Sequence, residues 1–224
     1  MEKNYIVIMG DLVSSKQMLE RGKVQNDLRH VLKHINQQYQ STIVADFMIS
    51  LGDEFQGVIA TPDSIFKIIL EIENTLEPVK IRFGVGIGTI TTDIYTNHSI
   101  EMDGSAYHRA RQMLVALKER EGQYASPHTN IMLKTAGSNQ AIDDLINSLL
   151  AANYAIKSRW TNRQKEVIQA YLSQKENQYQ TAEYLQIAQP NVSKSLANAK
   201  FYTYHAGNKA ITDYLTSEGV WPDE

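Results

Sequence analysis

The sequence predicts a mixed α/β (α+β) protein, in which a ferredoxin-like βαββαβ domain is followed by a small all-α domain. In the first 137 residues, apolar runs and alternating stretches typical of strands are interspersed with amphipathic helical segments. A polar break, Gly-Ser-Asn, follows at residues 137–139, and the remaining chain has only helical periodicity. We therefore expect one domain at residues 1–137 and a second at 138–224.

The N-terminal domain is expected to begin with a strand, a helix and two strands. Tyr5–Met9 is a continuous apolar run, which suits a central strand that is buried on both faces. Apolar residues at spacings of three and four predict an amphipathic helix at about 16–40. Two further strands are expected at 42–51 and 55–60.

A second helix, strand and helix complete the domain. Thr61-Pro62-Asp63 is typical of a helix start, and Glu77-Pro78 ends that helix. The next strand, 79–88, alternates between apolar residues on one face and three glycines on the other. Either a closely packed helix, the commoner reason, or a bound nucleotide explains those glycines. A helix at 105–121 and a last strand at 130–136 follow.

The stretch Met48–Gly57, MISLGDEFQG, predicts a tight hairpin with acidic residues at its tip. Asp53 and Glu54 lie between two apolar runs, and acidic residues are seldom buried without a partner. One interpretation is a turn with solvated acids. The other is a carboxylate ready to hold a hard cation.

The strand order favours the second interpretation. In a βαββαβ sheet strands one and three are neighbours, so Asp11 at the end of strand one is expected near Asp53. Two such carboxylates suit a pair of Mg²⁺ or Mn²⁺ ions that clamp a phosphoryl transfer, with the Leu12 carbonyl completing the shell. The small-residue turn after Asp11 offers backbone N–H groups to phosphate oxygens. The candidate nucleotide contacts are Leu12, Val13, Ser14, Ser15, Gly52, Glu54 and Arg109.

Two arginines lie on the predicted helix 105–121. Arg109 or Arg111 is expected to reach the phosphates of a substrate over the hairpin, where Arg111 would stabilise transition-state charge. The candidate catalytic residues are thus Asp11, Asp53 and Arg111. The alternative is an exposed helix face with ordinary ion pairs.

The C-terminal region is expected to contain a helix-turn-helix at about 161–215. Helices are predicted at 140–158, 161–173, 180–187 and 189 to about 215, with a tight turn before Pro190. Between residues 161 and 210 there are six Lys and Arg against three Glu, in a chain whose net charge is −3. The candidate DNA-binding residues are Gln189, Asn191, Ser193, Lys194 and Asn198, because amide side chains read base edges and Lys and Ser contact phosphates. Alternatively, this helix pair only packs against another part of the protein.

Composition narrows the protein class. The chain has 42% hydrophobic residues, enough to bury a core, and no Cys, which excludes disulfides and thiolate metal sites. No apolar run reaches the roughly 18–20 residues of a membrane span. We expect a cytoplasmic protein that does not insert into a membrane.

Four motifs resemble the nucleotidyl cyclase superfamily of class III and GGDEF cyclases. They are Gly10-Asp11-Leu12, LGDEFQG, RFGVGIG (Arg82–Gly88) and DGSAYHRAR (Asp103–Arg111), and the likeness covers about residues 3–136. More narrowly, the GDLVSSK start, the LGDEFQG hairpin and the appended helix-turn-helix resemble the SatD family. The resemblance implies that Asp11 and Asp53 bind metal and that the backbone from Asp11 to Ser15 holds phosphate.

The sequence also departs from the cyclase pattern. Ile49 stands where these cyclases often carry a base-reading Lys or Arg, and the substrate-orienting Asn of the late helix has no clear match. The preferred hypothesis is therefore a regulator with a metal-dependent domain that binds a nucleoside triphosphate, coupled to DNA binding. The alternatives are an active phosphoryl-transfer enzyme and a dimerising scaffold. A homodimer is expected because cyclase-like domains and helix-turn-helix proteins commonly pair.

Overall fold

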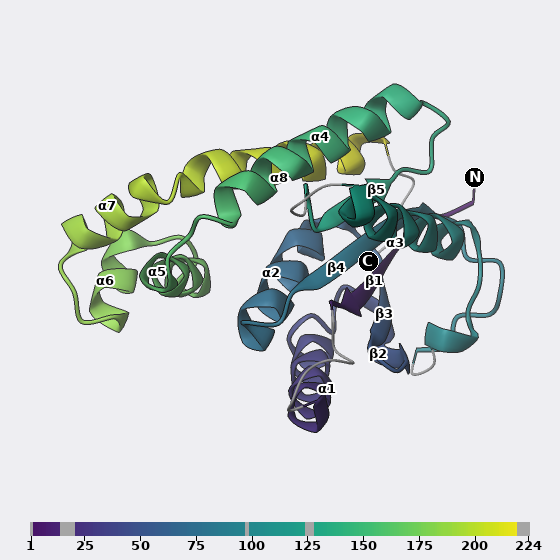
Figure 1. Ribbon diagram of the computed structural model, residues 1–224, viewed down its shortest axis with the longest axis horizontal. Coiled ribbons are helices and arrows are strands. Elements are labelled where there is room, and N and C mark those ends of the chain that lie inside the picture. The colour runs from purple at the N-terminus through teal and green to yellow at the C-terminus, as the bar shows by residue number, and fades with distance from the viewer. Residues whose placement is uncertain (1, 14–20, 97–98, 124–127, 219–224) are drawn as a thin grey trace.

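The computed structural model describes residues 2–13, 21–96, 99–123 and 128–218 (Figure 1). The strands are β1 (Tyr5–Leu12), β2 (Ile43–Leu51), β3 (Glu54–Ile59), β4 (Ile81–Gly88) and β5 (Ile131–Lys134). The helices are α1 (Arg21–Gln38), α2 (Ile65–Leu76), α3 (Ser105–Gln123), α4 (Gln140–Lys157), α5 (Asn162–Ser173), α6 (Gln178–Tyr184), α7 (Gln189–Asn198) and α8 (Phe201–Glu218). Two short 3₁₀ turns are η2 (Pro62–Ser64) and η3 (Ser99–Glu101).

The five strands form one sheet in the order β2-β3-β1-β4-β5. β1 is antiparallel to both β3 and β4, and β5 extends the edge parallel to β4. The predicted ferredoxin-like order, with strands one and three adjacent, is therefore confirmed. Consecutive residues of β1 point to opposite faces, so its continuous apolar run is buried on both.

Helices cover both faces of the sheet (Figure 1). The larger core lies between the sheet and α1 and α2, and includes Ile6, Ile8 and Phe83. The second core lies under α3 and includes Val7 and Met9. This alternation along β1 places Asp11 on the same face as α3.

The glycines of β4 let α3 lie directly against the strand. A Cβ atom at Gly84 would come within 2.2 Å of the Ala110 carbonyl oxygen, and one at Gly86 within 2.1 Å of the Ala106 carbonyl oxygen. Of the two explanations for the glycine-rich face, the packed helix is the one that the structure shows.

Side-chain amides satisfy backbone groups along both edges of the sheet. On β2, the Asn36 side chain accepts from the Phe47 amide at 2.8 Å and donates to the Phe47 carbonyl at 3.0 Å. On β5, Asn147 of α4 does the same for Leu133, at 2.9 and 2.8 Å. On each edge, the backbone N–H and C=O of one residue are therefore not available to a further strand.

The C-terminal helices extend from this sheet (Figure 1). α4 and α8 run side by side, and Ile146, Leu150, Ile211 and Leu215 join the larger core. At the far end, α5, α6 and α7 enclose a separate core that also contacts Leu70 of α2. The C-terminal region thus packs on the sheet domain through α4 and α8. The division of the chain into two domains at residue 137 stays a prediction.

The single helix expected from residue 189 to about 215 is instead two helices. Lys200 adopts a left-handed conformation with φ of 51°, which ends α7 and redirects the chain into α8. The buried Trp160 donates its indole N–H to the Ala199 carbonyl at 2.8 Å, and this bond fixes the break.

Among the described residues, no helix combines the length and apolar character that crossing a membrane requires.

Candidate functional site

The end of β1 meets the hairpin between β2 and β3, as the strand order predicted. Asp11 lies opposite Glu54 of β3 on one side and opposite Arg82 of β4 on the other. The Leu12 amide donates to the Asp53 carbonyl at 3.2 Å, which ties β1 to the hairpin tip. Gly52 has φ of 61°, a conformation that favours glycine in this turn.

Three positively charged side chains converge on the carboxylates at this end of the sheet. Lys118 of α3 places its Nζ atom 3.3 Å from Asp11 Oδ1 and 3.1 Å from Glu54 Oε1. Arg82 Nη1 donates to Asp11 Oδ2 at 2.7 Å. Arg111 Nη1 lies 3.4 Å from Glu54 Oε2. Both oxygens of each carboxylate therefore face a protein cation.

Arg82 is the most enclosed of these cations, with 14% of its side chain exposed. Its second guanidinium nitrogen donates to Glu121 at the end of α3. Burial lowers the pKa of Arg82, but Glu121 and Asp11 outweigh burial and raise the pKa above its ordinary value. The guanidinium is therefore a permanent positive charge between two carboxylates.

The two candidate arginines of α3 lie in different surroundings. Arg111 is brought to the hairpin, as expected, and its side chain is 55% exposed. Arg109 is not: its guanidinium donates to the Ile87 carbonyl at 2.8 Å and the Ala136 carbonyl at 3.3 Å. Ile87 lies at the opposite end of β4 from Arg82, so Arg109 is remote from Asp11. The periodicity of α3 could not predict this difference, because the tertiary contacts of the helix direct the two arginine side chains to different places.

The backbone amides predicted to hold phosphate are partly in use. Leu12 donates to Asp53, and Val13 donates to the Lys80 carbonyl at 2.8 Å. Neither N–H points to a free anion site in this arrangement. Ser14 and Ser15 lie outside the described residues.

Of the two carboxylates predicted to hold Mg²⁺ or Mn²⁺ ions, Asp11 and Asp53, Asp11 is paired with protein cations, as is the neighbouring Glu54. Divalent ions of this class need several oxygen ligands. Here the oxygens of Asp11 and Glu54 are already paired with Lys118, Arg82 and Arg111. Across residues 2–13, 21–96, 99–123 and 128–218, no three His, Asp or Glu side chains form a group that could hold a metal.

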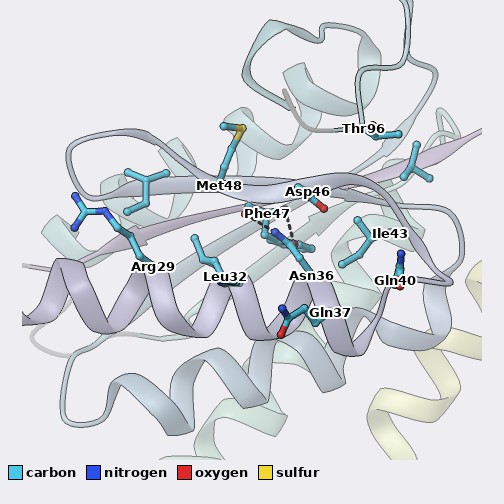
Figure 2. A pocket seen from close by; sticks show the side chains of 13 residues that line it. Arg29, Leu32, Asn36, Gln37, Gln40, Ile43, Asp46, Phe47, Met48 and Thr96 are labelled. Atoms are coloured by element: carbon cyan, nitrogen blue, oxygen red, sulfur yellow. Dashed lines mark hydrogen bonds between the residues drawn. The ribbon is translucent and has the colours of Figure 1, made fainter.

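A separate groove of about 920 Å³ runs between α1 and the edge strand β2. Figure 2 shows the Asn36 side chain hydrogen-bonded to the backbone of Phe47, with Arg29 and Asp46 also lining the groove. Burial raises the pKa of the Asp46 carboxyl above its ordinary value. Ile49, at the position where cyclases often read the base, lines this groove rather than the surface under α3.

The candidate DNA-binding residues lie on α7, which follows α6 after a turn at residues 185–188. Val192 and Leu196 are buried in the core of the helical region, whereas Asn191, Lys194 and Asn198 are exposed. Gln189 and Ser193 are half-buried.

The sequence did not predict a role for three residues at the hairpin end of the sheet and beside α7. Lys118 lies seven residues after Arg111 on α3, a spacing that puts both on one face. Arg82 becomes a partner of Asp11 only through the β1–β4 register. Gln178 accepts a hydrogen bond from Gln189 at 2.6 Å, and no sequence signal links these two residues across the turn.

Several solved structures are similar to this chain. A bacterial light-regulated adenylyl cyclase is 13% identical, with 59% of this chain and 76% of that chain covered and a TM-score of 0.42. The guanylate cyclase domain of RhGC from Catenaria anguillulae in complex with GTP is 16% identical, with 51% and 73% covered and a TM-score of 0.38. A regulator of polyketide synthase expression from Bifidobacterium adolescentis is 12% identical, with 94% and 82% covered and a TM-score of 0.30.

No curated protein matches the chain. The model of the SatD family, in contrast, matches residues 5–215, which include every strand and nearly all of the helical region. This match confirms the membership that the motifs predicted, and the chain belongs to the SatD family.

Proposed function

We propose that this protein is a cytosolic DNA-binding regulator in which α7 is the recognition helix. The observation that carries the proposal is the division of α7 into two faces. Its apolar residues are buried against α5, α6 and α8, and its amide and Lys side chains are exposed. A helix held in this way presents one polar face to the major groove.

The exposed residues of α7 have the chemistry that duplex DNA requires. Asn191, Lys194 and Asn198 follow one another at spacings of three and four, so they share a face of the helix. Asn side chains can form paired hydrogen bonds with the edge of adenine, and Lys contacts phosphate.

Gln189, the first residue of α7, is held in place by a neighbouring amide. Its Nε2 atom donates to Gln178 Oε1 at 2.6 Å, and Gln178 Nε2 donates to the Tyr202 hydroxyl at 2.7 Å. Fixing the amide before binding lowers the entropy cost of contacting a base. Gln178 thus acts as a positioning residue for Gln189.

The test is fluorescence anisotropy with duplexes selected from a random library by the purified protein. We expect binding that weakens with salt, with a log–log slope of about −0.9 for each phosphate contact. Lys194→Ala should weaken binding to all sequences and reduce this slope by about one. Lys67→Ala, which removes an exposed Lys from α2, is the matched control and should bind as the wild type does.

Two results would contradict DNA binding. One is that selection enriches no sequence and that affinity for duplex DNA does not depend on salt. The other is that Lys194→Ala and Lys67→Ala behave alike. Either result favours the scaffold hypothesis, in which α7 serves only to pack the protein.

A second candidate function is nucleotide binding at the hairpin end of the sheet. It is favoured by the exposed cations Lys118 and Arg111, which lie beside Asp11 and Glu54 in the motif region that resembles cyclases. Their side chains are 40% and 55% exposed, so a phosphate chain could reach them. This ligand would be a nucleoside triphosphate, and its binding would regulate α7.

Thermal unfolding with ATP or GTP tests this candidate, with Mg²⁺, with Mn²⁺ and with chelator. We expect a rise in melting temperature for the wild type and a smaller rise for Arg111→Ala. Equal shifts in the two proteins, or none, would contradict the site. Mass analysis of the incubated nucleotides separates a binder from a phosphoryl-transfer enzyme, and light scattering tests the predicted homodimer.

A further inference from the structure

The carboxylates of Asp11 and Glu54 converge on a single ammonium group. Lys118 Nζ lies 3.3 Å from an oxygen of Asp11 and 3.1 Å from an oxygen of Glu54. A divalent ion that bridges two carboxylates would occupy a position of this kind. The cyclase-like motifs imply a divalent ion held by Asp11 and Asp53, and the structure places the Lys118 ammonium group beside Asp11.

The position of Lys118 is set by the packing of α3. Gly84 and Gly86 bring the α3 backbone against β4, since a Cβ atom at either would strike a carbonyl oxygen of α3. One end of α3 is also held by the Glu121 contact with Arg82. The long Lys118 stem then extends from a fixed backbone to the carboxylates.

The six side chains of this ion-pair network carry no net charge, and Asp53 in the adjacent hairpin turn adds one negative charge. Asp11, Glu54 and Glu121 supply three negative charges, and Arg82, Lys118 and Arg111 supply three positive ones. A divalent ion placed between Asp11 and Glu54 would therefore meet the Lys118 ammonium at close range and the buried Arg82 behind it. Arg82 cannot lose its charge and is largely buried, whereas Lys118 is exposed enough to be neutralised by substitution without opening the core.

We propose that Lys118 is a built-in cation that takes the place of a divalent ion between Asp11 and Glu54. The wild-type protein then binds no divalent ion at these two carboxylates. Neutralising Lys118 leaves them with a net negative charge and creates a site for one divalent ion. This inference concerns the sheet domain and is independent of DNA binding by α7.

The test is isothermal titration of Mn²⁺ into the full chain, with electron paramagnetic resonance of free Mn²⁺ as a second readout. Lys118→Met removes the charge and keeps most of the stem, and Lys118→Arg keeps the charge as the matched control. We expect Lys118→Met to bind one Mn²⁺ at least about tenfold more tightly than the wild type and Lys118→Arg. Adding Glu54→Gln to Lys118→Met should abolish the gain.

Circular dichroism and melting temperature confirm that each variant is folded, and Lys118→Gln replaces Lys118→Met if the latter is not. The inference is overturned if the wild type binds Mn²⁺ as tightly as the neutral variant and loses it in Glu54→Gln. It is also overturned if a folded neutral variant gains no Mn²⁺ binding, or if the gain persists when Glu54 is changed.

Discussion

Lys157 of α4 places its ammonium group 2.6 and 2.7 Å from the two carboxylate oxygens of Glu73 on α2. Both side chains are largely buried, and Asn130 also donates to Glu73. This ion pair joins the helical region to the sheet domain. Lys165 and Glu77 form a second, more exposed pair at the same junction.

We expect Lys157→Met to lower the free energy of unfolding by about 3 kcal/mol, because Glu73 is left buried without its cation. The double variant Lys157→Met with Glu73→Leu should lose less, since no charge is then stranded. Urea denaturation of the two variants and the wild type gives the comparison. Equal losses in the single and double variants would show that packing, and not the charge, accounts for the effect.

Stability should fall at alkaline pH. Burial raises the pKa of Tyr204 above its ordinary value. Burial by itself would lower the pKa of Lys157, but the Glu73 carboxylate outweighs burial and raises that pKa above its ordinary value. The folded state therefore holds these protons at a pH where the unfolded chain releases them. The contribution of Tyr204 and Lys157 to the free energy of unfolding is fully present below about pH 10. It is lost as the pH rises beyond that value, by up to about 1.4 kcal/mol per pH unit for each proton.

Urea denaturation between pH 8 and pH 11 measures this dependence. Tyr204→Phe should have a shallower decline than the wild type. Tyr179→Phe is the matched control, because that ring is 76% exposed, and it should keep the wild-type profile. A Tyr204→Phe profile identical to the wild type would contradict the assignment.

Gly86→Ala should destabilise the protein by about 2–4 kcal/mol, because the added methyl group would lie 2.1 Å from the Ala106 carbonyl and force α3 away from β4. Gly22→Ala in α1 is the matched control. A Cβ atom there has no neighbour within 4 Å, so we expect stability to rise by about 0.5 kcal/mol through helix propensity. Thermal unfolding of the two variants distinguishes them, and a neutral Gly86→Ala would show that α3 does not pack on β4 as described.

Arg109→Ala should reduce stability by about 1–2 kcal/mol and leave any nucleotide-induced shift in melting temperature unchanged. The guanidinium binds the carbonyls of Ile87 and Ala136, which would lose their donor. Arg111→Ala should have the opposite pattern, with little loss of stability and a smaller nucleotide shift. A nucleotide shift that disappears in Arg109→Ala would restore its predicted binding role.

Gln178→Ala should weaken binding to the selected DNA by about tenfold, although Gln178 is not on α7. If Gln178 acts by orienting Gln189, the double variant with Gln189→Ala should bind DNA no more weakly than Gln189→Ala alone. Anisotropy titrations of the four proteins form the cycle. Fully additive losses would mean that Gln178 contacts DNA by itself or has no role in positioning Gln189.

Local patterns in the sequence were enough to predict most elements and the sheet order. The alternation in β4, the apolar run of β1 and the Thr61-Pro62 helix start depend on neighbouring residues and backbone preferences. The βαββαβ order then placed Asp11 beside the hairpin, because that order makes strands one and three adjacent. The break at Lys200 was missed, because a single non-glycine residue in the left-handed conformation leaves no mark on helical periodicity.

By itself, the sequence determined the fold class, the SatD motifs and the meeting of Asp11 with the hairpin. Only the tertiary structure decided which charges face these carboxylates. Arg82 arrives through strand register, Lys118 through the packing of α3 on glycines, and Arg109 is drawn to the far end of β4. Side-chain partners of this kind depend on distances between elements that are remote in sequence, and electrostatic energies change steeply over a few ångströms.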